Sequence, residues 1–292
     1  MNYRISNSSL SVKISSRGGE IRSMCDADGR EYIWQGDAEI WEDRAPNLFP
    51  YIGRMTEKSY QFQGKKYHMD IHGFLPTSEM ELVSKTEESL TLKLDASEET
   101  LIQYPFLFRL EITWKLVGPR LEITYQIKNK DEKTMYFGIG GHPGFIVPIE
   151  QGAKFDDYRI DFGENASPKR VMMSEDCFVL EGEEVLELTE GRYLKLRHDL
   201  FDHDAIILKE IPREVKLNCE KGGREIVVSF PDMDYLGIWH RPFKTPDYVC
   251  IEPWSSLPSR KGIIEDITQQ PGLKDLESGE VYRNSWSILI RW

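Results

Sequence analysis

The stretch Phe108–Leu116, FRLEITWKL, followed after Gly118-Pro119 by Leu121–Ile127, LEITYQI, decides the fold expected for this chain. Apolar and polar residues alternate in both segments, which places every second side chain on one face of an extended strand. Gly118-Pro119 marks a turn, because proline cannot donate to a sheet ladder and glycine adopts turn conformations readily. We therefore predict two half-buried antiparallel strands joined by a tight turn.

Similar alternation occurs on both sides of this pair. The glycines of Arg17–Glu20 predict a hairpin turn between strands at Ser9–Ser15 and Ile21–Met24, and Lys58–Met69 predicts a hairpin around Gly64. We predict further strands at Ser89–Leu94, Tyr158–Phe162, Tyr193–Leu196, Ala205–Leu208, Val215–Cys219, Glu225–Phe230, Leu236–His240, Tyr248–Glu252 and Ser285–Trp292.

Helical periodicity is nearly absent. Only Glu98–Tyr104 suggests one helical turn, and no segment carries a long apolar stripe with a period of 3.6 residues. Strands at this spacing, with turn signals between them, predict an all-β protein built as a large antiparallel sandwich. The chain has no linker, repeat or low-complexity tract, so we predict a single domain over residues 1–292.

The composition excludes several classes of partner. The net charge of -12 argues against nucleic acid and anionic membrane surfaces, which both require clustered Lys and Arg. The four cysteines include no CxxC pair, so we expect reduced and mostly buried thiols. No apolar run has the length of a signal peptide core or a membrane span, so we expect a cytoplasmic protein.

The segment Gly138–Phe145, GIGGHPGF, is the most unusual stretch for function. Glycine permits backbone angles that other residues avoid, so this run can bend sharply and approach a ligand closely. His142 is held in its middle, and an imidazole exchanges its proton near neutral pH. Taken alone, the pattern also fits a tight turn with an exposed histidine.

The sequence surroundings of the histidines and the absence of other motifs exclude several kinds of site. His72 in IHGF and His240 in WHRPF are the other distinctive histidines, whereas we expect the remaining three, His68, His198 and His203, at the surface. No HxH or HExxH spacing occurs, so no metal site is predicted. Neither a GxSxG elbow nor a phosphate-binding glycine loop is present, which disfavours serine nucleophiles and nucleotide use.

Glu252 is the carboxylate that stands out. In Asp247–Trp254, DYVCIEPW, it shares a strand face with Cys250, in surroundings that are otherwise apolar. We expect it to face a partly desolvated cavity, where burial raises a carboxyl pKa towards the range of a general base. The alternative is a solvated glutamate at a strand end. Upstream, Trp41–Met55 reads as a buried irregular segment that presents Arg54.

Four motifs in the same order resemble the aldose 1-epimerase (galactose mutarotase-like) family, in particular its LacX-type branch. They are FPYIGRM with Arg54, IHGF with His72, GIGGHPGF with His142 and IEPW with Glu252, and the resemblance extends over nearly the whole chain. It implies a large antiparallel β supersandwich.

The resemblance also implies roles for individual residues. Glu252 would be the catalytic base and His142 the catalytic acid, while Arg54 and His72 would bind sugar hydroxyls. The family's site aspartate matches Asp204 in DHDAIIL, with Asp202 as the alternative. GGHPGF and EPW differ from the better-known mutarotase versions of these motifs, so the resemblance does not identify which sugar is the substrate.

The implied reaction interconverts the α and β anomers of a hexose or related sugar, and we expect one carboxylate and one imidazole on opposite sides of that sugar. Its proton transfers need neither an electron carrier nor a metal, so we expect no cofactor and a small-molecule sugar as the partner. Trp239 and Trp254 are candidates for stacking on a sugar face, although core packing is the commoner role of Trp. His240 is a further candidate for the cleft wall, without an assigned role.

Three other functions remain open at this point. A hexose-phosphate 1-epimerase would need additional cations near the cleft, for which the candidates are Lys58, Lys65, Lys66 and Arg241. A non-catalytic carbohydrate-binding or sensor protein would keep the cleft but lose no rate when Glu252 is replaced. A glycosidase ranks last, because it needs paired carboxylates and only Glu252 is singled out.

Overall fold

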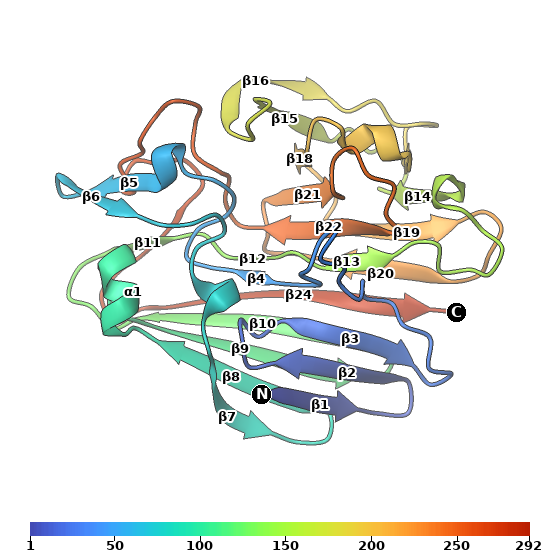
Figure 1. Cartoon of the computed structure of the whole chain (residues 1–292), viewed down its shortest axis with the longest axis horizontal. Helices are drawn as coiled ribbons and strands as arrows, with labels where there is room; N and C mark the ends of the chain where they lie inside the picture. Colours follow the sequence, from blue (N-terminus) through green and yellow to red (C-terminus); the bar gives the residue numbers. More distant parts are fainter.

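The computed structural model describes residues 1–292 and consists mostly of antiparallel strands in two large and three small sheets (Figure 1). The predicted all-β class is confirmed. The largest sheet has nine strands in the order β17 (Tyr193–Lys195), β14 (Tyr158–Asp161), β19 (Glu214–Cys219), β20 (Glu225–Ser229), β24 (Val281–Arg291), β10 (Arg120–Asn129), β9 (Phe108–Val117), β8 (Ser89–Asp95) and β7 (Glu81–Lys85).

A second sheet carries the segments of functional interest. Its order is β16 (Val179–Val185), β15 (Lys169–Met173), β18 (Ile206–Lys209), β21 (Tyr235–Trp239), β22 (Tyr248–Trp254), β12 (Gly140–Gly141) and β4 (Asn47–Leu48), with β13 (Gly144–Ile146) also paired to β22. The GIGGHPGF segment therefore forms two very short strands, β12 and β13, along one edge of β22, and β21 lies along the other.

The remaining elements are small. The β1–β2–β3 sheet (Asn2–Ser6, Leu10–Ser15, Ile21–Asp26) lies in front of β8–β10 in Figure 1, and the Ser6 amide donates to the Glu87 carbonyl beside β8. Two-stranded sheets pair β5 with β6 (Ser59–Phe62, Lys65–His68) and β11 with β23 (Met135–Phe137, Lys274–Leu276). The helical segments are α1 (Glu98–Gln103) and the 3-10 turns η1 (Thr56–Lys58), η2 (Leu75–Thr77), η3 (Phe155–Asp157) and η4 (His198–Phe201).

The central hairpin forms as its alternation predicts. β9 and β10 pair in a register that sets apolar residues directly opposite each other, such as Ile123 opposite Trp114 and Tyr125 opposite Ile112. Buried and less buried positions alternate along both strands. The buried faces join a core cluster of 64 residues that runs from Ile5 to Ile290.

A buried polar group joins the two large sheets. Tyr125 on β10 donates a 2.8 Å hydrogen bond to Asn47 on β4, and Trp286 on β24 donates a 3.0 Å bond to Tyr125. All three side chains are buried. This polar group fixes β4 and β12 against the nine-stranded sheet, because each of its hydrogen bonds would be costly to lose in the interior.

The glycines of GIGGHPGF are required for a different reason from the one expected. Gly138, Gly140, Gly141 and Gly144 are absent from the positions with positive φ, so no left-handed bend demands them. A Cβ atom on Gly141 would instead lie 2.5 Å from the Trp286 ring, and one on Gly144 would lie 2.8 Å from Trp41. These glycines allow close packing of β12 and β13 rather than sharp bending.

None of the helices combines the length and the apolar character that crossing a membrane requires.

We predict that Gly141→Ala lowers the free energy of unfolding by about 1–3 kcal/mol, because its methyl group would overlap the fixed Trp286 ring. Gly223→Ala is the matched control, since no heavy atom lies within 4 Å of a Cβ there and its φ is not positive. We expect the control to change stability by less than about 0.5 kcal/mol. Urea unfolding followed by fluorescence measures both, and equal stabilities would contradict the packing explanation.

Candidate active site

The five residues singled out by motif lie around one cavity of about 430 Å³. They come from five separate parts of the chain and are Arg54, His72, His142, Asp204 and Glu252. Asp202, the alternative site aspartate, does not line this cavity. The fold therefore brings these five residues together around one cavity. Their roles in a reaction remain predictions.

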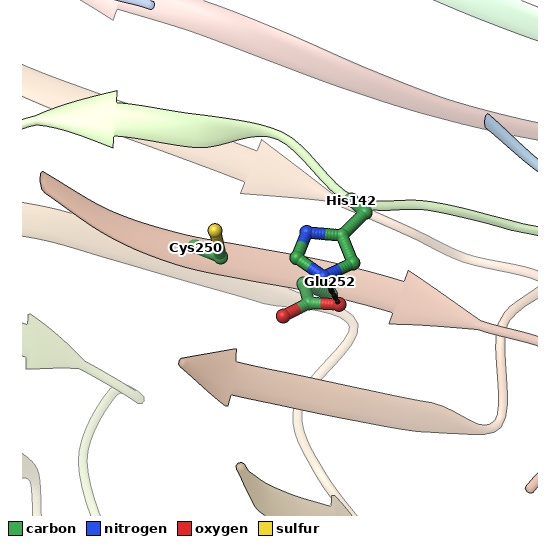
Figure 2. A group of neighbouring side chains, drawn as sticks. All are labelled: His142, Cys250 and Glu252. Carbon is green, nitrogen blue, oxygen red and sulfur yellow. Dashed lines mark ion pairs between the residues drawn. The ribbon is translucent and has the colours of Figure 1, made fainter. Parts of the chain in front are cut away.

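His142 and Glu252 are in direct contact. The Nε2 atom of His142 lies 3.1 Å from Oε2 of Glu252, between the segment after β12 and strand β22 (Figure 2). Both residues are buried, with exposed fractions of 8% and 1%. We expected an imidazole and a carboxylate on opposite sides of a sugar, but this arrangement places them side by side. They approach a ligand from one direction.

Strand pairing accounts for the position of Glu252. β22 is buried along its whole length, and Glu252 projects from it on the same face as Cys250, as the alternation predicts. Gly237 lies opposite Glu252 on β21, where a Cβ atom would lie 3.1 Å from the Trp254 ring and 3.3 Å from the Cβ of Glu252, so the glycine makes room for these two side chains. His142 is fixed through its backbone amide, which donates a 2.9 Å hydrogen bond to the Pro46 carbonyl.

Burial shifts both groups towards their neutral forms. It raises the pKa of the Glu252 carboxyl well above its usual range, the charge of Asp204 raises it further, and the Trp254 indole opposes the increase. Burial likewise lowers the pKa of His142 well below its usual range, with a contribution from nearby His72. Glu252 thus has the raised proton affinity that its sequence setting predicts.

Aromatic rings enclose the imidazole of His142. Trp41 lies at a centroid distance of 5.1 Å in a tilted arrangement, and Trp239 meets the imidazole edge-on at 5.5 Å. His72 also approaches edge-on, at 5.5 Å. Trp254 lines the cavity too, although it packs in a small apolar cluster. These walls exclude water from the pair while offering apolar surface to a ligand.

Gly53, the residue before Arg54, forms two hydrogen bonds with His72. The amide of Gly53 donates to Nδ1 of His72 at 3.1 Å, and the amide of His72 donates to the Gly53 carbonyl at 3.0 Å. His72 has a φ of 66° and Gly73 a φ of 77°, so the IHGF motif makes a left-handed turn that glycine tolerates. The irregular segment Trp41–Met55 therefore presents Arg54 to the cavity next to His72.

The ring of His72 is uncharged at neutral pH. Burial lowers its pKa to about 4, the charge of Arg54 contributes to this decrease, and Asp204 acts in the opposite direction. Its Nδ1 accepts the Gly53 amide hydrogen, so the other ring nitrogen of the neutral form carries the proton. His72 can therefore donate a hydrogen bond to a ligand oxygen.

Asp204 occupies a constrained position before β18. Its φ is 69°, and one carboxylate oxygen, Oδ1, accepts a hydrogen bond of 2.9 Å from the Ala205 amide. Its charge influences both Glu252 and His72. Asp202 acts instead on the pKa of His240, outside the cavity.

Two expectations about other histidines are wrong. His240 does not line the cavity, because it is fully buried between Phe155 and Phe201 and its Nε2 lies 3.0 Å from Nδ1 of His198. His198 is therefore half-buried and structural rather than a free surface residue. His203 is exposed as expected, yet it lines the cavity.

Several lining residues carried no recognisable motif. Trp41 and Cys177 belong to this group, whereas Arg241 and Phe243 lie in WHRPF, a segment noted for His240, in which Arg241 was considered only as a cation for a phosphate. Trp41 is the first residue of the irregular apolar segment Trp41–Met55, which also contains Arg54. Its place in that segment could have identified it as a lining residue. The other three lie in loops whose path across the sheet edge is not encoded by local periodicity.

One group of side chains has donor atoms close enough together to be considered for a metal. His142, Cys250 and Glu252 each place one such atom within 4.8 Å of the others (Figure 2). Burial and the neighbouring Glu252 raise the pKa of the Cys250 thiol well above its usual range. Because metals bind the thiolate, this shift disfavours Cys250 as a ligand.

The charges around His72 predict pKa shifts of opposite sign in two variants. Arg54→Gln should raise the pKa of His72 above about 4, because it removes a repelling cation, and Asp204→Asn should lower it further, because it removes an attracting anion. NMR titration of the imidazole C–H signals, assigned with His72→Asn, measures the shifts. Asp202→Asn should leave the pKa unchanged. Shifts of the same sign in the first two variants would contradict this geometry.

Comparison with known proteins gives consistent matches over the chain. A family model described as Aldose 1-epimerase matches residues 1–274. The chromosomal protein LacX of Lactococcus lactis subsp. lactis is 32% identical over 301 aligned residues, which cover 99% of this chain and 99% of that protein.

Solved structures match equally completely. A galactose mutarotase related enzyme from Lactobacillus acidophilus has a TM-score of 0.96 at 33% identity, covering 100% of this chain and 98% of that one. A galactose mutarotase-like protein from Lactobacillus casei ATCC 334 has a TM-score of 0.94 at 30% identity, with 100% of both chains covered. The expected supersandwich architecture is therefore confirmed by its structural neighbours.

Proposed function

This chain belongs to the aldose 1-epimerase family, and we propose from that membership and the cavity geometry that it interconverts the α and β anomers of a hexose or related sugar. The family identifies an isomerase that acts on a sugar. The observation that carries the finer proposal is the 3.1 Å contact between His142 and Glu252 at the cavity wall.

The reaction needs two proton transfers at neighbouring oxygens. A base removes the proton of the anomeric hydroxyl O1 while an acid protonates the ring oxygen O5, and the C1–O5 bond breaks to give the open-chain aldehyde. Rotation about C1–C2 and the reverse transfers close the ring on the other face. O1 and O5 are both bonded to C1, so two adjacent side chains can serve them from one side.

We assign the base to Glu252 and the acid to His142. This assignment requires a charged carboxylate and a protonated imidazole before ring opening, a state that burial makes less stable than the neutral pair, whereas afterwards both groups are neutral. The pair therefore holds one proton throughout, and no exchange with solvent is required. Burial of both side chains favours the neutral form, which accompanies the open-chain sugar.

The surrounding residues can orient the sugar in the cavity. Arg54 can donate several hydrogen bonds in a fixed plane, and neutral His72 can donate one, so both suit sugar hydroxyls. The Asp204 carboxylate accepts hydrogen bonds from hydroxyls on the same ligand. This set provides donors and acceptors around a ring whose anomeric carbon faces the pair. The chemistry itself uses only proton transfer and therefore calls for no cofactor.

A hexose phosphate is the second candidate substrate. Of the four cations considered, Arg241 lines the cavity, whereas Lys58, Lys65 and Lys66 do not. Lys58 instead pairs with Asp70. Arg241 is exposed at this position and can reach a phosphate, but the carboxylates of Asp43 and Asp204 share the same cavity and oppose a dianion. The neutral sugar is the better match.

We predict that Glu252→Gln and His142→Gln each lower kcat by roughly 10²–10⁴-fold, because each removes a proton-transfer group. NMR exchange spectroscopy on freshly dissolved α-glucose and α-galactose measures the rate. His68→Gln, at an exposed histidine outside the cavity, is the matched control and should behave as wild type.

The same experiment separates the alternatives. Sugar binding by the wild type without any acceleration would contradict the epimerase proposal and favour a sensor. Faster exchange with glucose 6-phosphate than with glucose, lost in Arg241→Gln, would favour the phosphorylated substrate.

We also predict that Asp204→Asn lowers kcat/KM by roughly tenfold or more, since a charged hydrogen-bond acceptor for the sugar is lost. Asp202→Asn should retain the wild-type value because its side chain lies outside the cavity. Initial rates over a range of galactose concentrations measure both variants. An effect confined to Asp202→Asn would reverse the assignment of the site aspartate.

A further inference from the structure

Cys177 is a residue of the cavity wall that no sequence motif singled out. It lies in the loop between β15 and β16, on the side of the cavity formed by that hairpin. Its Sγ atom is 2.8 Å from Oδ2 of Asp204 and is the donor in this hydrogen bond. The Ala205 amide occupies the other carboxylate oxygen, Oδ1, so each oxygen of Asp204 has one partner within the protein.

The thiol acts as a donor because it stays protonated. Burial raises the pKa of Cys177 to about 12, and the Asp204 hydrogen bond and charge contribute to the increase. A thiolate beside Asp204 would place two negative charges together, which the partly buried setting disfavours. The geometry therefore fits an S–H group that donates to a carboxylate at neutral pH.

The turn that carries Cys177 is closed by its own hydrogen bonds. The Cys177 amide donates to the Ser174 carbonyl at 2.9 Å, and the Ser174 hydroxyl donates to Asp176 at 2.6 Å. Lys261 pairs with Asp176 at 3.2 Å, which ties the turn to a neighbouring loop. Hydrogen bonds and an ion pair therefore fix the position of the turn that carries the thiol.

The backbone conformation of Cys177 also indicates a functional role for its side chain. Its φ is 68°, in the left-handed region where glycine is favoured and a side chain carries a conformational cost. Asp204, its partner, has a φ of 69°. Two non-glycine residues in this region, joined through their side chains at a cavity wall, form a constrained pair of the kind found at functional sites.

We propose that Cys177 is a positioning residue that holds the Asp204 carboxylate in the orientation in which it binds the sugar. This inference rests on the proposed epimerase function. Cys177 acts through Asp204, whose charge also reaches His72 and Glu252. Loss of the thiol frees Oδ2, so the carboxylate can rotate away from both the sugar and His72. The expected consequence is weaker sugar binding with little change in the proton-transfer step itself.

Three variants test the proposal. Cys177→Ala removes the donor, Cys177→Ser restores an O–H donor, and Cys25→Ala is the matched control. Cys25 also donates to a carboxylate, Glu31 Oε2 at 3.3 Å, but it lies on β3 outside the cavity. Thermal unfolding of all three is recorded, so that a loss of stability is distinguished from a loss of positioning.

We expect Cys177→Ala to raise KM for galactose roughly tenfold with a smaller change in kcat, as for a weakened hydrogen bond to the substrate's partner. In the same variant the pKa of His72, followed by NMR, should fall below its wild-type value because the Asp204 charge is no longer fixed nearby. Cys177→Ser should restore both quantities, and Cys25→Ala should change neither.

The NMR titration does not depend on activity, so it keeps the two proposals apart. If the wild type fails to accelerate anomer exchange, the proposed function is wrong, yet the His72 titration still decides whether Cys177 positions Asp204. A wild-type KM and His72 pKa in Cys177→Ala would overturn the positioning role. So would a Cys177→Ser variant as impaired as Cys177→Ala, since that outcome indicates packing alone.

Discussion

Strand β22 crosses the middle of the eight-stranded sheet, and the geometry of the site depends on what lies opposite its side chains. The inward residues Cys250, Glu252 and Trp254 pair with Gly144, Gly237 and Gly140, respectively. A Cβ atom at Gly144 would lie 2.8 Å from the Trp41 ring, and Cβ atoms at Gly140 and Gly237 would lie 2.8 and 3.1 Å from the Trp254 ring, so these glycines make room for the two tryptophans beside the carboxylate. Glu252 is therefore enclosed by aromatic side chains and still lines the cavity. The raised pKa of Glu252 follows from this arrangement.

Much of the fold was predictable because its central strands are long and buried on one face. The alternation in Phe108–Leu116 and Leu121–Ile127 predicted both strands and their pairing with each other. The strands that were missed lack this signal for physical reasons. β7 is exposed along its whole length, β16 is largely exposed and acidic, and β12 has only two residues. Such segments become strands through their neighbours in the sheet, which override local preference.

The candidate site was predictable in its residues but not in its arrangement. Motif order located Arg54, His72, His142 and Glu252 without showing that the last two are in contact. The separation of side chains from distant segments is set by sheet register, which one sequence does not display. Cys177 was missed for the same reason, since its partner lies 27 residues away in a loop. The sequence favoured Asp204 over Asp202 by motif, and the path of the turn before β18 places Asp204 at the cavity.

The reciprocal hydrogen bonds between Gly53 and His72 have a mechanical consequence. They make the two loops one rigid wall, so a substitution that shifts either loop also displaces the other, and Arg54 with it. Among the other residues that line the cavity, no hydrogen bond joins Met173 or Cys177 to Arg241–Phe243, so a shift in one of these two loops can leave the other in place.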